Sequence, residues 1–154
     1  MMSFNEAKKI FISHHNSQAG KLSAFKSEVE KAGFKAFLAH EDIRPGQHDL
    51  EVIEKELKAC DVFLYICSEK SNRSAFCQQE IGMAKGLEKE IVAAMIDSPP
   101  KGFIAHQQAV RCKDFDSVFM NVFEHLPQDE EIKEHLAILG CKGFSKEKKK
   151  VIFT

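Results

Sequence analysis

The segment SAFCQQEIGMAKG, residues 74–86, contains one carboxylate, Glu80, among mostly small, apolar and amide side chains. Phe76 and Ala84 lie four residues before and after it, so all three share one stripe of a helix. A carboxylate between an aromatic ring and a methyl group is partly removed from water and can face a ligand. The pattern leaves two interpretations: a solvated charge on a helix surface, or the centre of an active site.

His14 and His15 follow an apolar run and are of the residue type that metal sites and general bases use. Neighbouring residues at the end of a strand point in opposite directions, so the two rings cannot hold one ion together. We therefore predict no metal site and expect one of the two to contact a ligand.

Ser74 is the first residue of the segment that contains Glu80 and is predicted to be its helix N-cap. A nucleophilic role is disfavoured, because no base is signalled beside it. The cysteines are odd in number and none are spaced as C-x-x-C, which predicts small buried side chains and neither disulfides nor a zinc cluster. They are Cys60, Cys67, Cys77, Cys112 and Cys141.

Size and composition indicate one globular domain with an ordinary core. The chain has 154 residues, of which 44% are hydrophobic and 29% charged, and its formal net charge is -1. Such a charge does not favour nucleic acid or an acidic membrane surface as a partner. No apolar run approaches the roughly 20 residues that span a bilayer, and the start lacks a signal-peptide core. We therefore expect a cytoplasmic protein.

Strands and helices are predicted to alternate along the chain. Apolar runs predict strands at 8–13, 34–39, 61–68 and 90–97, with a short fifth at 108–112. Apolar spacing of three and four residues predicts helices at 17–32, 50–60, from 74 onward and at 115–126, with Gly33 ending the first. Residues 69–74 are expected to form a polar loop, and 128–154 a C-terminal helix with a lysine-rich tail.

This alternation predicts a doubly wound α/β domain with a parallel sheet and helices on both faces. Ligands of such sheets bind beyond the carboxyl ends of the strands, which is also where the helix from Ser74 begins. Glu80 can therefore lean toward that rim. The chain has neither a G-x-x-x-x-G-K-[ST] loop nor a G-x-G-x-x-G turn, and its first strand does not end in an acidic pair. A P-loop enzyme, an ordinary dehydrogenase and a phosphate-accepting receiver domain are thus disfavoured.

Four motifs, in their order and spacing, resemble a Toll/interleukin-1 receptor (TIR) domain, and prokaryotic members more than animal receptors. They are KKIFISHH, FKAFLAHEDIRPGQ, LKACDVFLYICSEKSNRSAFCQQEIGMA and EIVAAMI. The resemblance covers roughly residues 8 to 126 and implies a flavodoxin-like sheet with strand order 2-1-3-4-5. It assigns residues 1–127 to the TIR domain.

Many members of that family cleave the nicotinamide–ribose bond of NAD with a glutamate, which corresponds to Glu80. The resemblance also implies an aromatic contact from Phe76, where many members have tryptophan. Ser74 opens the same motif and is included among the substrate contacts. Since nicotinamide is already cationic on the ribose and departs as a neutral molecule, no general acid is needed. One carboxylate can stabilise the positive charge that grows on the sugar.

The loop after the first strand contributes ligand contacts in the family, and here it offers Ser13, His14 and Asn16. The family's BB loop corresponds to FLAHEDIRPG, residues 37–46, with Asp42 and Arg44, and is expected to act as a lid and self-association surface. NAD enters as the substrate, and no cofactor is expected. In bacteria such proteins resemble components of anti-phage defence, in which a separate effector senses the product.

Two alternatives remain open. Many TIR domains only assemble with other TIR domains, although scaffolding members often lack the glutamate that this chain has. A nucleoside-processing enzyme, such as a deoxyribosyltransferase-like protein, also uses a glutamate on a similar sheet. Nicotinamide release from NAD and a nucleoside panel distinguish the three functions.

Overall fold

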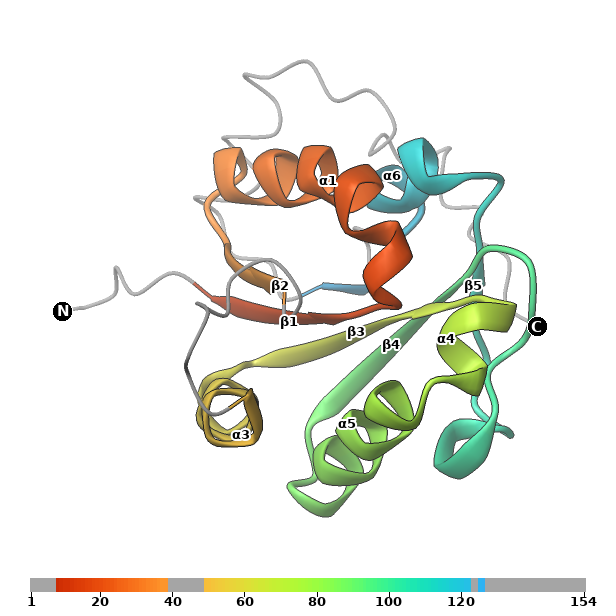
Figure 1. Ribbon diagram of the computed structural model, residues 1–154. Helices are drawn as coiled ribbons and strands as arrows, with labels where there is room; N and C mark the ends of the chain where they lie inside the picture. The colour runs from red at the N-terminus through yellow and green to blue at the C-terminus, as the bar shows by residue number, and fades with distance from the viewer. Residues whose placement is uncertain (1–7, 39–48, 123–124, 127–154) are drawn as a thin grey trace, which may run out of the picture.

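Five parallel strands form one sheet in the order β2-β1-β3-β4-β5 (Figure 1). The computed structural model describes residues 8–38, 49–122 and 125–126. The strands are β1 (Lys9–Ser13), β2 (Lys35–Leu38), β3 (Val62–Cys67), β4 (Glu90–Met95) and β5 (Val110–Arg111). The predicted α/β class and flavodoxin-like strand order are confirmed.

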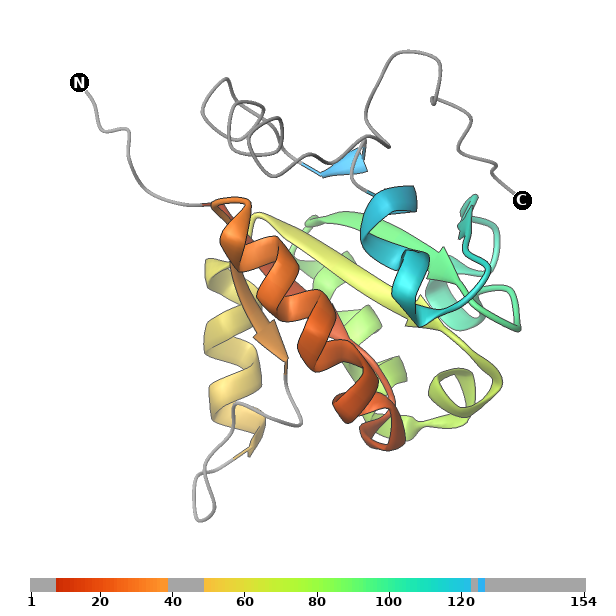
Figure 2. The same ribbon diagram turned by 90° about the horizontal axis from the view of Figure 1, so that it is seen from above.

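Helices lie on both faces of this sheet. The α-helices are α1 (Ala19–Lys31), α3 (Asp49–Ala59), α4 (Glu69–Arg73), α5 (Ala75–Gly86) and α6 (Val118–Val122). Short 3-10 turns are η2 (Asn16–Gln18), η3 (Gly102–Ile104) and η4 (Phe115–Ser117). Helices α1 and α6 lie side by side over one face, and α3 and α5 cover the other (Figures 1 and 2).

The alternation of side chains along each strand divides the core into two clusters. In β1, Ile10 and Ile12 point toward α1 and α6, whereas Phe11 points toward α3 and α5. Every residue of β3 is buried, as expected of a central strand covered on both faces. Ser13, the last residue of β1, continues the alternation on the α5 side.

Helix α1 ends as its sequence predicts. Gly33 has a φ of 106°, a left-handed conformation that glycine adopts without steric cost. The chain then turns back so that the N–H of Phe34 donates to the carbonyl of Val29 at 3.1 Å. This stop places β2 directly beside β1, with Lys35 opposite Lys9.

Three local predictions were wrong. Residues 69–73 form helix α4 and not a polar loop, because Ser68 and Ser71 cap its first turn reciprocally. Leu50 was expected on the buried face of α3 but is 58% exposed, since the packing begins one turn later at Ile53. The last helix was expected over 115–126, whereas the described part consists of η4 followed by α6.

Other expectations fall partly outside the described residues. Cys60, Cys67, Cys77 and Cys112 are free and buried, as predicted, while Cys141 and residues 128–154 lie outside the described chain. Within the described ranges, none of the helices is long and apolar enough to cross a bilayer.

Candidate functional site

Helix α5 carries the central residue of the candidate site on its buried side. Ser74 caps the helix by accepting a hydrogen bond from the backbone N–H of Cys77 at 3.2 Å, as predicted. Four residues at helical spacing are then buried against the sheet. They are Cys77, Glu80, Ile81 and Ala84. Glu80 therefore occupies a position that packing alone would give to an apolar side chain.

Glu80 points inward to the end of β1. Its side chain is 1% exposed, and Ser13 donates a hydrogen bond from Oγ to Glu80 Oε1 at 2.6 Å. Ser13 is fully buried, ends the central strand β1 and is paired with Tyr65 of β3. The contact thus joins the carboxyl end of the first strand to a helix 67 residues further along the chain.

Burial dominates the electrostatics of this carboxyl group. It raises the pKa of Glu80 to about 7, and the hydrogen bond from Ser13 acts in the opposite direction. The neighbouring titratable groups are Tyr65 on β3 and Cys77 on α5. Burial also raises the pKa of both, that of Cys77 to about 11. Both side chains are therefore neutral near pH 7, where the protonated and ionised forms of Glu80 are both populated.

The second carboxyl oxygen of Glu80 differs from the first in its surroundings. Among the residues that the structure describes, no group forms a hydrogen bond with the buried Glu80 Oε2. Burying a polar atom without a partner costs roughly 1–3 kcal/mol, so such atoms are few in native proteins. An oxygen kept in this state is available to a ligand that reaches it.

Phe76 and the loop after β1 take different positions around this pair. Phe76 lies in the first turn of α5 and is 39% exposed, so its ring is accessible at the surface. His14 is fully buried, and its Nδ1 donates to the carbonyl of His15 at 2.9 Å. Asn16 lies in η2, and its side chain is not among those described.

The remaining candidates divide into those placed and those outside the description. Asp42 and Arg44 lie outside the described residues, so their predicted contacts stay predictions. The hydroxyl of Ser74 caps α5 by accepting from the N–H of Cys77, whereas the hydroxyl bonded to Glu80 is that of Ser13. In the part of the chain that is described, no three His, Cys, Asp or Glu residues are placed to hold a metal ion.

A buried polar network that the sequence did not predict braces the loop after β1. Gln18 Nε2 donates to Ser68 Oγ at 2.8 Å, and Gln18 Oε1 accepts from the backbone N–H of His15 at 3.0 Å. Ser68 in turn exchanges hydrogen bonds with Ser71 in the cap of α4. One part of this network has a local sequence signal: Ser68 and Ser71 have the three-residue spacing of a capping box.

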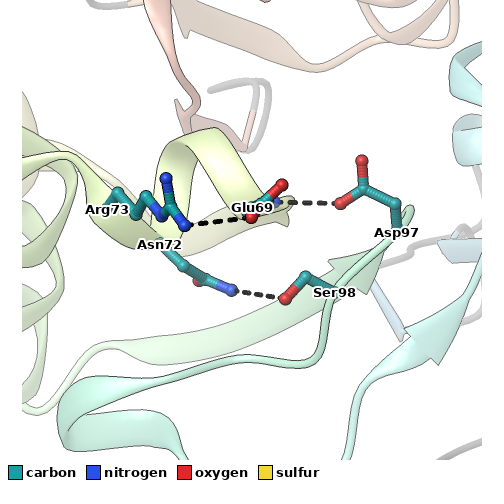
Figure 3. Close-up of polar contacts among 5 residues, drawn as sticks. All are labelled: Glu69, Asn72, Arg73, Asp97 and Ser98. Atoms are coloured by element: carbon teal, nitrogen blue, oxygen red, sulfur yellow. Dashed lines mark hydrogen bonds and ion pairs between the residues drawn. The ribbon is translucent and has the colours of Figure 1, made fainter.

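The ends of β3 and β4 form a second polar rim (Figure 3). Asp97 accepts from the backbone N–H of Glu69 at 2.9 Å, and Asn72 donates to Ser98 at 3.2 Å and to the carbonyl of Pro99 at 2.7 Å. Cavities of about 450 and 530 Å³ border this rim, and Glu80 lines neither of them. Tyr65 donates to Asn72 at 2.7 Å and so connects the rim to the interior near Glu80.

The fold and the inward carboxylate at the carboxyl edge define a flavodoxin-like α/β domain with a candidate site at the end of its first strand. The family profile of the TIR domain matches residues 10–126. The chain therefore belongs to the TIR domain family, which was the resemblance suggested by its motifs. No curated protein sequence matches it.

Solved structures share the fold at low sequence identity. The TIR domain of the Toll-related receptor TRR-2 from Hydra magnipapillata has a TM-score of 0.61 at 19% identity, over 75% of this chain and 95% of that one. The CMP N-glycosidase BcmB from Clostridium botulinum has a TM-score of 0.60 at 16% identity, over 77% and 100%. A 2-desoxiribosyltransferase from Leishmania mexicana has a TM-score of 0.58 at 15% identity, over 78% and 99%.

A fourth structure belongs to an assembly. The TIR domains of the activated Roq1 resistosome, which recognises the pathogen effector XopQ, have a TM-score of 0.53 at 14% identity, over 88% of this chain and 85% of that one. At these identities the similarity shows a common fold.

Proposed function

We propose that this TIR domain cleaves the nicotinamide–ribose bond of NAD with Glu80 as its catalytic carboxylate. The observation that supports this most is the burial of Glu80 at an apolar position of α5, with one oxygen held by Ser13. A purely structural role would be met by an apolar side chain without the cost of desolvation. Groups with strongly perturbed titration are concentrated at functional sites.

The chemistry needs little more than a positioned negative charge. As the nicotinamide leaves with the bonding electron pair, the ribose carbon becomes cationic, and the Glu80 carboxylate stabilises that charge. Neutral nicotinamide needs no proton, so a second carboxylate is not required. The accessible ring of Phe76 is suited to stack on a flat group of the substrate and to exclude water.

Under this proposal the product is ADP-ribose, a cyclised ADP-ribose or ADP-ribose transferred to another acceptor. A role in bacterial anti-phage signalling, with an effector that senses the product, extends the same proposal. So does assembly through TIR–TIR contacts, with the loop of Asp42 and Arg44 closing the site of a neighbouring copy.

The test is nicotinamide release from NAD by the purified protein, measured over a range of protein concentrations because of the proposed assembly. Glu80→Gln keeps the shape of the side chain and removes its charge, so we expect at least a hundredfold loss. Glu30→Gln, an exposed position on α1, is the matched control and should retain full activity. A folded Glu80→Gln protein that retains a third of the activity would rule out the catalytic assignment.

A second candidate is cleavage of the N-glycosidic bond of a nucleoside or nucleotide. The same buried carboxylate supports it, because a cationic sugar carbon arises in that reaction as well. A panel of nucleosides and nucleotides offered beside NAD separates the two enzymes. Inactivity toward all of them, across the concentration range, would favour the non-catalytic assembly role.

A further inference from the structure

The contact between Ser13 and Glu80 is fixed from both sides. Ser13 ends a central strand, and its backbone is paired in register with Tyr65 of β3. Glu80 is held by the packing of Ile81 and Ala84 on the same helix face. The 2.6 Å distance from Ser13 Oγ to Glu80 Oε1 is in the range of a hydroxyl bonded to a charged carboxylate.

A serine hydroxyl has one proton to donate, and here it is donated to Glu80. Ser13 is itself fully buried and has no donor left for a substrate. The bond also fixes which carboxyl oxygen turns toward β1, leaving Oε2 as the oxygen that can meet a ligand.

Two other titratable groups lie near Glu80 among the described residues, and both are neutral near pH 7. Tyr65 from β3 and Cys77 from the preceding turn of α5 both have a raised pKa, caused first by burial. His14 follows Ser13, and its Nδ1 donates to the carbonyl of His15 at 2.9 Å. The hydroxyl of Ser13 is thus the group that favours ionised Glu80 against its burial.

We infer that Ser13 is a positioning residue of this site, which holds the Glu80 carboxylate ionised and oriented and does not contact the substrate. This replaces the sequence-based expectation of Ser13 as a ligand contact. The inference rests on the proposed function only for what the carboxylate then does.

The first arm of the test titrates the carboxyl carbon of Glu80 by NMR, with the signal assigned by its loss in Glu80→Gln. Ser13→Ala removes the donor, and Ser13→Cys replaces it by a nearly isosteric weak donor. Ser117→Ala removes a hydroxyl from the distant cap of η4 and is the matched control. We expect the titration midpoint of Glu80 to rise in both Ser13 variants and to stay unchanged in the control.

The second arm measures nicotinamide release against pH. At pH 7 Ser13→Ala should have about tenfold lower kcat, because a hydrogen bond to a charged group has been lost. Activity should return to within about twofold of wild type at pH 9, where the carboxylate is ionised without help. A raised KM at all pH values, with an unmoved acid limb, would instead make Ser13 a substrate contact.

The two arms separate this inference from the proposed function. If the wild type releases no nicotinamide, the proposed function fails, while the NMR titration still decides the role of Ser13. An unchanged Glu80 midpoint in folded Ser13→Ala or Ser13→Cys overturns the inference whatever the activity. Failure of both variants to fold would also overturn it, by assigning Ser13 to stability.

Discussion

Helices α1 and α5 pack on opposite faces of the same sheet, and each buries one stripe of side chains against it. The buried positions of α1 and its C-cap are Leu22, Phe25, Val29 and Ala32, and those of α5 are Cys77, Glu80, Ile81 and Ala84. Hydrophobic burial accounts for the whole of the first set. In the second set hydrophobic burial does not explain Glu80. The buried carboxylate on α5 therefore indicates a role beyond packing, which the apolar face of α1 does not.

The largest stability effect should come from the packing face. Leu22→Ala removes a fully buried side chain and should lower the free energy of unfolding by about 2–5 kcal/mol at every pH. Leu50→Ala makes the same substitution at an exposed position and should change it by less than about 0.5 kcal/mol. Denaturant unfolding measures both, and similar losses at the two positions would contradict the described core.

Glu80 on the buried face of α5 should make the free energy of unfolding depend on pH. In the unfolded chain Glu80 ionises at its ordinary pKa of 4.5, whereas in the folded protein the pKa is about 7. Between these values the folded state binds the additional proton, so the free energy of unfolding falls as pH rises and levels off above about 7. The difference between the folded and unfolded pKa values of Glu80 corresponds to roughly 3 kcal/mol in the free energy of unfolding.

Denaturant unfolding of wild type and Glu80→Gln between pH 4.5 and 8 checks this dependence. The wild type should lose roughly 3 kcal/mol more than Glu80→Gln over that range, because the variant has no group to titrate at this position. Glu30→Gln on α1 should follow the wild type. Parallel curves for wild type and Glu80→Gln would show that the buried carboxyl is not perturbed.

The smallest effect concerns the start of the carboxyl-bearing helix. Ser74→Ala removes the acceptor that caps α5 and should lower the free energy of unfolding by about 1 kcal/mol. The loss should be independent of pH, since no titrating group is changed. An unaltered stability would mean that another group satisfies the N–H of Cys77.

The comparison of the two faces also shows which structural features local sequence patterns can predict. The apolar spacing of α1, the doubly covered β3 and the cap at Ser74 all follow from local patterns, and each was predicted. Helix α4 was not, because four of its five side chains are exposed or half-buried and give no apolar period. Leu50 has the correct spacing, but spacing does not reveal where the packing partner ends.

The candidate site was predictable only in part. The motif around Glu80 and the rule that parallel strands end at one edge indicated the region. The hydrogen bond from Ser13 joins residues 67 positions apart, and no local pattern encodes such a contact. Gln18 and Ser68, separated by 50 positions, were missed for the same reason.

Cys77 lies one turn before Glu80 on the buried side of α5, so its thiol reports on the exposure of this region. Its thiol is shielded in the folded protein, and burial raises its pKa to about 11, so it reacts slowly with alkylating reagents. Any fluctuation that lifts this face of α5 from the sheet uncovers the thiol together with the acid. The rate at which Cys77 is alkylated therefore measures how often the interior beside Glu80 opens to solvent.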